Sequence, residues 1–406
     1  MDVLALTEQL VAIDSQNPGP FESEVAAFVD EWARARGFDS RIIEVSPGRP
    51  NLVVSLDRGG PGHLALSGHL DTKPIGDARL DWHTPPLQLT VVDDMAYGLG
   101  ATDMKGAVAA MMVTLERLAV APETGTGTVT LLLTADEEQG SDHGAKALVT
   151  AGLLPAVDAI VIGEPSGVQK PWEAVHLVSR GICCFEVEVS TRQGHSSLSA
   201  QLGRNAVLVA ADLLRAFEDF HPSVASPGTV PCAPTVNPGI TVAGGVGYGT
   251  WPGLCRVGME IRLVPGMSQE ALRREVAELV ERAVGTQAQA RIRYADGSQG
   301  WMPAVELASD APVARAARAA AEHVLGRPVP FAAFPGGTDA THFLGKAGIP
   351  TVASLGPGWL SVAHGANECV GIDQLTQAVE IYERLVTSYL AEVALQASAT
   401  PSANKE

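Results

Sequence analysis

Three short apolar segments in the first half of the chain each end in histidine or acidic residues. The segments cover residues 63–66, 129–134 and 159–162, and they lead into His69, Asp136 and Glu164. Short continuous apolar runs are typical of strands buried on both faces, and the stretch between the first two contains a helical pattern over residues 105–118. Strands that alternate with helices predict an α/β fold, a central mixed sheet flanked by helices.

The pattern changes in the middle of the chain. Residues 183–190 and 256–263 alternate like strands, and residues 203–218 and 268–284 have helical spacing. The first pattern then returns, with a helix over 311–325 and another over 374–392. Since 406 residues exceed the usual size of one domain, we predict a catalytic domain in two pieces around a smaller inserted α+β lid or dimerisation domain. The predicted boundaries are residues 1–175 and 289–395 for the catalytic domain, 176–288 for the insertion and 396–406 for a flexible tail.

Charge and composition exclude several classes of partner. The net charge is -18, and no run rich in Lys or Arg occurs, so binding to nucleic acid or to anionic membranes is not expected. No stretch reaches the roughly 18 apolar residues of a membrane helix, and the first residues do not resemble a secretory signal. The five cysteines show no spacing typical of a disulfide scaffold or a CxxC motif. Free thiols in a cytoplasmic protein are therefore expected.

The polar residues that follow the strands form a donor set for metal ions. His69 and Asp71 are two residues apart and lie on the same side of an extended chain, where the carboxylate can orient the imidazole. Asp136, Glu137 and Glu138 follow the next strand, and three adjacent carboxylates repel one another unless a cation is present. The alternatives are a solvated loop histidine with a turn-forming Asp, and an acidic turn in water.

Further candidates come from glycine-rich segments. Asp103 lies in the segment YGLGATDMKG before a helix, where an N-cap is the alternative. The late segments PGGTDATHF and GPGWLSVAHGANE supply Asp339 and two histidines, His342 and His364. In open α/β sheets ligands bind beyond the carboxyl ends of the strands. A nitrogen and oxygen donor set at that place suits Zn²⁺, Co²⁺ or Mn²⁺, and its order along the chain suits two ions that share one carboxylate.

In combination these segments resemble a known family. SGHLDTKP, YGLGATDMKG, TADEEQGS, GEPS, GHSS, EIRLVPGM, GGTDA and the late HGANE are similar to the di-zinc amidohydrolases and metallopeptidases that include acetylornithine deacetylase, succinyl-diaminopimelate desuccinylase, aminoacylase and carboxypeptidase G. The resemblance extends over nearly the whole chain. It implies hydrolysis of the amide bond of a small N-acyl amino acid or peptide-like substrate, with two divalent metal ions, zinc first and cobalt or manganese next, as cofactors.

The resemblance also implies a role for individual residues. His69 and Glu164 would bind one metal ion, Glu138 and His364 the other, and Asp103 both. Asp71 would orient His69. Glu137 would be the general base that activates a metal-bridging water as hydroxide. The peptide bond between Asp103 and Met104 is expected to be cis.

The inserted domain is expected to supply supporting residues. By resemblance, His195 in GHSS would reach across a homodimer interface and stabilise the oxyanion in the partner's active site. Arg262, Asn237 and Arg180, together with Thr338, would contact the substrate. For His195 the alternative is an ordinary loop histidine, and a lone Arg on a strand is often a surface salt-bridge partner.

The substrate stays open at this point. YGLGATDMKG, GEPS and the spacing within LGPGWLSVAH favour an acetylornithine deacetylase-like enzyme, whereas GGTDATHF is closer to the desuccinylases and aminoacylases. A dipeptidase or carboxypeptidase-type enzyme is the alternative. A catalytically silent binding homologue would need to lack a ligand or the base, and all are present. A nucleophilic hydrolase is disfavoured because no GxSxG segment occurs.

Overall fold

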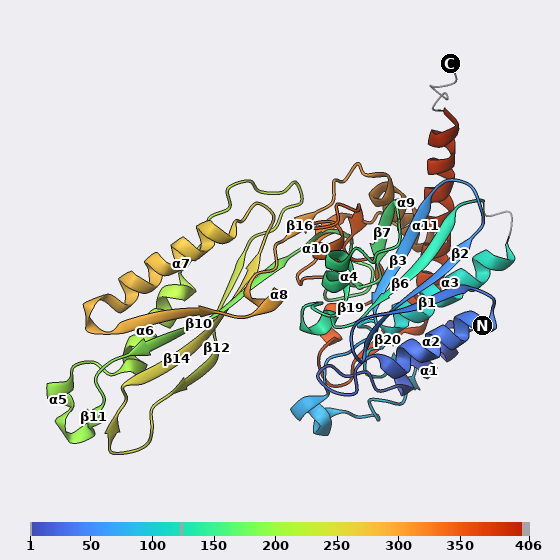
Figure 1. Cartoon of the computed structure of the whole chain (residues 1–406). Helices are drawn as coiled ribbons and strands as arrows, with labels where there is room; N and C mark the ends of the chain where they lie inside the picture. Colours follow the sequence, from blue (N-terminus) through green and yellow to red (C-terminus); the bar gives the residue numbers. More distant parts are fainter. Residues whose placement is uncertain (1, 122–124, 400–406) are drawn as a thin grey trace. The chain divides into compact units, whose positions relative to one another are not determined.

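Contacts within the chain define two compact units. The computed structural model describes residues 2–121 and 125–399 (Figure 1). The large unit comprises Met1–Ser179 and Glu306–Glu406, and the small unit comprises Arg180–Val305. The chain thus leaves the large unit once and returns to it, as an inserted unit requires.

The large unit is built on a six-stranded mixed sheet. Its order is β1-β2-β6-β3-β7-β18, and its strands are β1 (Asp39–Ser46), β2 (Arg49–Asp57), β3 (His63–His69), β6 (Thr128–Thr134), β7 (Ala159–Ile162) and β18 (Thr351–Val352). β6, β3, β7 and β18 are parallel neighbours, and β1 and β2 are antiparallel. The three apolar segments predicted as buried strands are therefore neighbours, and their carboxyl ends meet at one edge of the sheet.

Helices pack against this sheet. They are α1 (Val3–Ala12), α2 (Ser23–Ala35), α3 (Lys105–Val120), α4 (Ala145–Ala151), α9 (Pro312–Leu325), α10 (Ala340–Phe343) and α11 (Ile372–Ala399). α3 and α11 pack on each other and on β3, whereas α2 packs on β1 and β2. α3 is buried along most of its length because Ala, Gly and Met fill its surface. A mixed sheet flanked by helices confirms the predicted fold class. No described helix is both long and apolar enough to cross a membrane.

Short strands complete the large unit. They are β4 (Thr90–Val92), β5 (Met95–Tyr97), β8 (Pro165–Gly167), β9 (Val175–Ser179), β16 (Val305–Glu306), β17 (Phe331–Ala333), β19 (Gly356–Trp359) and β20 (Cys369–Gly371). β20 pairs with β5, which joins two segments that are far apart in the sequence. At the end of the chain the prediction of a tail from residue 396 is wrong for residues 396–399, because α11 continues to Ala399. The rest of the predicted tail lies outside the described residues.

The small unit is an antiparallel sheet covered by two helices. The sheet has the order β12-β14-β10-β15, and its elements are β10 (Gly181–Ser190), β12 (Thr235–Gly244), β14 (Leu254–Leu263), β15 (Gln289–Tyr294), α6 (Ala206–Glu218) and α7 (Gln269–Val284). Every second residue of β10 and β14 is buried against the helices. Since β15 pairs with β10, the small unit continues beyond the predicted boundary at residue 288. The small unit also contains the short elements β11 (Gly194–His195), β13 (Thr250–Trp251), α5 (Ser199–Leu202) and α8 (Gly297–Gly300).

Two buried histidines are expected to make the large unit less stable in acid. Burial lowers the pKa of His176 to about 4 and that of His342 to about 3. The unfolded chain binds protons near pH 6.5, so the folded state loses stability as the pH falls below that value. Between pH 7 and pH 5 each histidine should cost about 2 kcal/mol. We expect His342→Gln to reduce the acid-induced loss of unfolding free energy by that amount in denaturant titrations, and His83→Gln, at an exposed position, to leave it unchanged.

Candidate metal centre

The ends of three parallel strands bring the candidate residues together. β3 ends at His69, and Glu164 follows β7 after one glycine. β6 ends at Thr134, and after Ala135 the backbone of Asp136 adopts a left-handed conformation. A short 3-10 helix, Glu137–Gln139, begins directly after it. Since parallel strands end at the same edge, the alternation of strands and helices in the sequence places these side chains in one cluster.

Two further residues reach this cluster from loops. Asp103 lies immediately before α3, and the peptide bond between Asp103 and Met104 is cis, as predicted. His364 lies in the segment between β19 and β20 and has a positive φ of 61°. Asp103 is buried, whereas the side chain of His364 remains partly exposed.

Asp103 stands between the two histidines. Its Oδ1 lies 2.9 Å from Nε2 of His69, and its Oδ2 lies 3.1 Å from Nε2 of His364. A second carboxylate accompanies each histidine. Glu164 Oε1 is 3.7 Å from His69 Nε2, and Glu138 Oε2 is 3.2 Å from His364 Nε2. The result is two sets of one histidine and one glutamate that share the carboxylate of Asp103.

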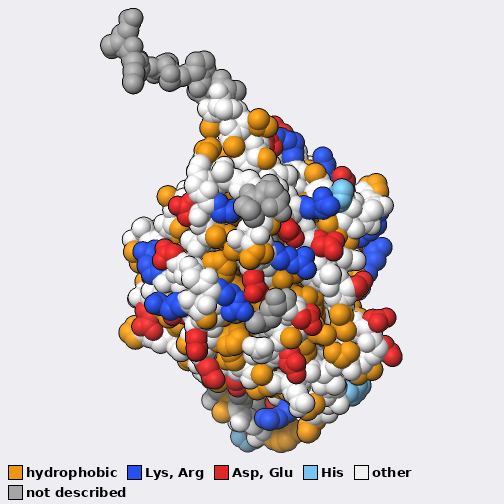
Figure 2. Space-filling model, turned by 90° about the vertical axis from the view of Figure 1, so that its right-hand side faces the viewer, with side chains coloured by type: hydrophobic (Ala, Val, Ile, Leu, Met, Phe, Trp, Pro, Cys, Tyr) orange, Lys and Arg blue, Asp and Glu red, His pale blue; other side chains and the backbone are white. Residues whose placement is uncertain are grey.

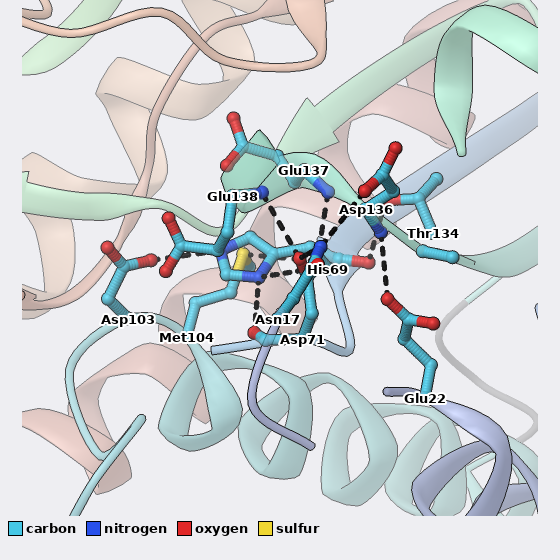
Figure 3. Close-up of polar contacts among 12 residues, drawn as sticks. Asn17, Glu22, His69, Asp71, Asp103, Met104, Thr134, Asp136, Glu137 and Glu138 are labelled. Atoms are coloured by element: carbon cyan, nitrogen blue, oxygen red, sulfur yellow. Dashed lines mark hydrogen bonds and ion pairs between the residues drawn. The ribbon is translucent and has the colours of Figure 1, made fainter. Parts of the chain in front are cut away.

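Glu137 lies beside this arrangement. One ligand atom each of His69, Glu137 and Glu164 lie within 4.8 Å of one another, and the same holds for His69, Asp103 and Glu138. Figure 3 shows that the side chains of Glu137 and Glu138 leave the backbone in different directions. Although adjacent in sequence, the two glutamates therefore present their carboxylates to different parts of the cluster.

Asp71 holds the backbone of the acidic segment. Its carboxylate accepts hydrogen bonds from the backbone N–H groups of Glu137 and Glu138, both at 3.2 Å. The contact of Asp71 with His69 is less direct. Nδ1 of His69 lies 2.9 Å from the backbone oxygen of Asp71 and 3.6 Å from its carboxylate. The carbonyl of Asp71 is thus the closer partner of the imidazole, and the carboxylate mainly anchors the neighbouring glutamates.

A network that sequence analysis did not identify supports Asp71 and Asp136. The side-chain amide of Asn17 donates to Asp71 at 2.8 Å and to Asp136 at 2.9 Å (Figure 3). Arg49 binds Glu22 through two hydrogen bonds and reaches Asp136 at 3.0 Å. Asn17 belongs to the segment SQNP and precedes a cis proline, so it carried a sequence signal. Arg49 and Glu22 carried none, because only the fold brings them together.

Two other residues lie beside the centre: Lys73, which was not predicted, and Asp339, which was a candidate from the GGTDA segment. The side chain of Lys73 contacts the backbone oxygen of Glu138 and lies 3.3 Å from its carboxylate. Asp339 is buried and accepts hydrogen bonds from Thr134, at 2.7 Å, and from Ser141. Lys73 follows the strand-end motif directly, so it stood next to residues that the sequence singled out.

The histidines and Asp103 shift one another's pKa values. Burial would lower the pKa of His69, but hydrogen bonds with Asp103 and Asp71 raise it well above its usual value. Burial would also lower the pKa of His364, but its contacts with Asp103 and Glu138 raise this pKa to about 11. The pKa of Asp103 is lowered despite its burial, because both histidines bind it. The three side chains are therefore strongly coupled to one another.

The pKa values of Glu137 and Glu164 shift in the opposite direction. Burial raises the pKa of Glu137 and of Glu164 well above the usual value, and the charge of Asp103 raises both further. Four carboxyl groups this close repel one another when all are ionised. A divalent cation relieves that repulsion, and imidazole with carboxylate is a donor set that zinc and related ions accept. The residues present therefore fit a metal centre.

The predicted substrate-contacting residues lie mostly in the small unit. Arg262 and Asn237 both bind Glu260, at 2.8 Å and 3.1 Å. Arg180 donates to the backbone oxygen of Ala233 at 2.7 Å and to other groups nearby. These three residues thus gather around neighbouring parts of β12 and β14. Arg262 forms a salt bridge with Glu260, which was the alternative given above for a lone Arg on a strand.

The last two predicted residues differ in their exposure. His195 is exposed in the small unit, and its Nδ1 accepts hydrogen bonds from the backbone and hydroxyl of Ser197. Thr338 lies in the large unit, where it is buried, and its hydroxyl accepts from Ala340 N at 3.3 Å. Their roles toward a substrate stay predictions.

Comparison with known proteins bears on this geometry. The family model described as Peptidase family M20/M25/M40 matches residues 65–388. A succinyl-diaminopimelate desuccinylase of Xanthomonas campestris pv. campestris (strain 8004) is 29% identical, over 96% of this chain and 99% of its own length. The match therefore includes both compact units.

Solved structures agree in fold. The M20 family metallo-carboxypeptidase Sso-CP2 from Sulfolobus solfataricus superimposes with a TM-score of 0.77 at 19% identity, covering 96% of this chain and 99% of that one. The di-peptidase Dug1p from Saccharomyces cerevisiae gives a TM-score of 0.76 at 16% identity, covering 95% of each chain. Since the family model spans most of the chain, the chain belongs to peptidase family M20/M25/M40 and is a metal-dependent hydrolase of linear amide bonds.

Proposed function

We propose that this enzyme releases the amine from a small N-acyl amino acid, using two divalent metal ions of which zinc is the first candidate. The observation that carries the proposal is the position of Asp103, whose two oxygens each face one histidine and its accompanying glutamate. An arrangement with two equivalent halves and one shared carboxylate suits a pair of ions better than a single ion.

The residues divide between the two ions as follows. His69 and Glu164 would hold one ion, His364 and Glu138 the other, and Asp103 both. When bound, the ions polarise the scissile carbonyl and make a water molecule acidic near neutral pH. Asp71 keeps the ligand segment in place through the backbone of Glu137 and Glu138, and Asn17 keeps Asp71 in place.

Glu137 is proposed as the general base. Its carboxylate lies within 4.8 Å of ligand atoms of His69 and Glu164, and the proposed ligand set does not include it. Burial raises its pKa well above the usual value of a glutamate, and a base with a raised pKa takes up a proton more readily near neutrality. Glu137 would accept the proton of the attacking water and pass it to the nitrogen of the leaving amine.

The small unit is proposed to recognise the substrate. Arg262 and Asn237 share Glu260 as a partner, so their donors are already held in place on one face of the sheet. A substrate carboxylate would compete with Glu260 for the guanidinium of Arg262, with which it can form a bidentate pair. Arg180 and Thr338 are further candidates. The guanidinium of Arg180 donates to Ala233 and Thr235, and the hydroxyl of Thr338 accepts from Ala340.

The choice of acyl group on the substrate rests on the relatives of this chain. The comparisons do not favour acetylornithine, and the curated relative from Xanthomonas is named for succinyl removal. We therefore propose an N-acyl amino acid and give an N-succinyl amino acid the first place among the candidates. A dipeptidase or carboxypeptidase is the second candidate, because both activities occur in the names of solved structures with this fold.

Amine release from a substrate panel tests the proposal. The panel contains N-succinyl and N-acetyl amino acids, acetylornithine among them, and unmodified dipeptides. Each is assayed with metal-loaded enzyme. Release from N-acyl amino acids at a kcat/KM well above that for dipeptides supports deacylation. The reverse order replaces it with peptidase activity, and release from no member contradicts both.

A homodimer is proposed for the small unit. β12 lies at the edge of its sheet, and four apolar side chains on it or directly after it are more than half exposed, Ile240, Val242, Val246 and Tyr248. An exposed apolar edge strand readily pairs with another strand.

The five free cysteines agree with a reducing compartment, so we propose a cytoplasmic location.

Loss of His195 should lower turnover strongly. If this exposed side chain donates to the oxyanion in the partner's active site, His195→Ala lowers kcat by about 10²-fold, the effect of removing one such donor. The measurement is steady-state kinetics on the best substrate of the panel. His221→Ala changes an exposed histidine of the same unit and should have no effect.

Mixing two inactive variants tests whether His195 acts across the dimer. In a mixed dimer of His195→Ala and Glu137→Gln chains, one active site would combine an intact Glu137 with the other chain's His195. Activity should then reappear after subunit exchange. If His195 acts within its own chain, the mixture stays inactive, and a monomer in light scattering would also refute the proposal.

A further inference from the structure

Glu368 is a buried acid that the proposed chemistry does not use. Its side chain is 2% exposed. One carboxylate oxygen accepts the backbone N–H groups of Thr102, at 3.0 Å, and of Asp103, at 2.9 Å. The other oxygen accepts the N–H of Gly100, at 3.0 Å. The carboxylate therefore fills the inside of the loop that leads to Asp103.

The backbone of Glu368 and Cys369 also binds the loop that leads to Asp103. Gly98 N donates to the backbone oxygen of Glu368 at 2.9 Å, and the hydroxyl of Thr102 donates to the backbone oxygen of Cys369 at 2.6 Å. β20, which begins at Cys369, pairs with β5 just before the loop. His364 stands only four residues before Glu368, so the loop of Asp103 and the segment of His364 form one connected body.

We propose that Glu368 is a positioning residue that sets the distance and orientation of Asp103 relative to His364, and thereby the affinity of the centre for its metal ions. The inference rests on the proposed metal ligands. Groups that orient the ligands of a metal typically change its affinity by about 10-fold to 100-fold when they are replaced. Here the oriented part is the backbone of the shared ligand.

The hydrogen bonds of Glu368 require a carboxylate. Both of its oxygens accept N–H groups, so a glutamine would turn its own NH₂ group toward at least one backbone N–H. Each oxygen already accepts from the backbone, so neither can be replaced by a donor without loss of a contact. A neutral side chain of the same shape should therefore loosen the loop without emptying the space.

Glu368→Gln in the full-length enzyme tests the proposal. We expect its affinity for Zn²⁺, measured by competition with a chromophoric chelator, to fall by about 10-fold to 100-fold. In the Co²⁺-loaded protein the visible absorption bands should shift, since the ligands around the ion have moved. With saturating metal, kcat should fall while KM stays near the wild-type value, because Glu368 does not touch the substrate.

Glu322→Gln is the matched control. Glu322 on α9 also accepts a backbone N–H, that of Val329 at 3.2 Å, but it has no contact with the loop of Asp103. Its replacement should leave zinc affinity and the cobalt spectrum unchanged. Equal zinc affinity and an unchanged spectrum in Glu368→Gln would overturn the proposal. A wild-type enzyme that binds no zinc would instead refute the proposed metal centre.

A second variant covers a failure of Glu368→Gln to fold. Glu368→Asp keeps the charge and withdraws it by one methylene group, so the loop keeps an acceptor but loses its geometry. We expect it to fold and to show a smaller loss of zinc affinity than the glutamine variant. Wild-type affinity and turnover in Glu368→Asp would overturn the proposal, because the position of the carboxylate would then not matter.

Discussion

Replacing Glu137 with glutamine is expected to lower kcat by about 10³-fold while two metal ions remain bound. General base catalysis contributes about 10²-fold to 10⁴-fold in enzymes, and an amide cannot take up the proton of the attacking water. The metal should be retained because the proposed ligand set, His69, Glu164, Asp103, Glu138 and His364, does not include Glu137. The measurements are steady-state kinetics and metal content by atomic emission.

Glu138→Gln separates the two neighbouring glutamates. Glu138 lies 3.2 Å from His364, so its replacement should release metal as well as abolish turnover. If Glu137→Gln loses metal and Glu138→Gln keeps it, the base and the ligand have been exchanged. If Glu137→Gln keeps wild-type turnover, another group is the base, and Asp339, whose pKa burial raises to about 6, would be examined next.

Removal of the metal ions is expected to abolish turnover and to destabilise the large unit. Without cations, burial and the neighbouring carboxylates make the charges of Glu137 and Glu164 unfavourable, and the pKa of each is raised. A ligand at about 1,000 times its dissociation constant stabilises the folded state by about 4 kcal/mol. For a unit of this size the loss should lower Tm by about 10 °C. Calorimetry of chelator-treated protein provides the measurement.

The small unit serves as the internal control. Its hydrophobic core lies between its own sheet and helices, and none of the proposed ligands belongs to it. Its unfolding transition should therefore keep its Tm when metal is removed. Zn²⁺ or Co²⁺ should restore both turnover and Tm, whereas Mg²⁺ should not, since it prefers an environment of oxygen ligands and water. Full turnover in metal-free protein would refute the metal-dependent mechanism.

Much of the metal centre could be predicted because its chemistry is local in the sequence. His69, Glu137 and Glu164 each follow an apolar strand within a few residues. Parallel strands end at one edge of a sheet, so the order of strands and helices already brings these residues together. The same reasoning predicted the α/β fold, because alternating apolar strands and helices have few other ways to bury their surfaces.

The supporting residues could not be predicted in this way. Arg49 carries no local pattern, and Glu368 lies in the HGANE segment without a sign of its role; each acts on a segment far away in the sequence. The end of the small unit was predicted too early, at residue 288, because β15 joins this unit through its pairing with β10. The residues between two strands that are distant in the sequence do not indicate whether these strands pair.

The sequence by itself determined the donor set, the order of the ligands and the alternation that makes the central sheet. These properties depend on residue type and on spacing along one strand, which folding does not change. Only the tertiary structure decided the distances of Asp103 from the two histidines, that the carbonyl of Asp71 is the closer partner of His69, and that Glu368 holds the loop of Asp103. The physical reason is that these distances join segments whose approach is set by packing of the whole large unit.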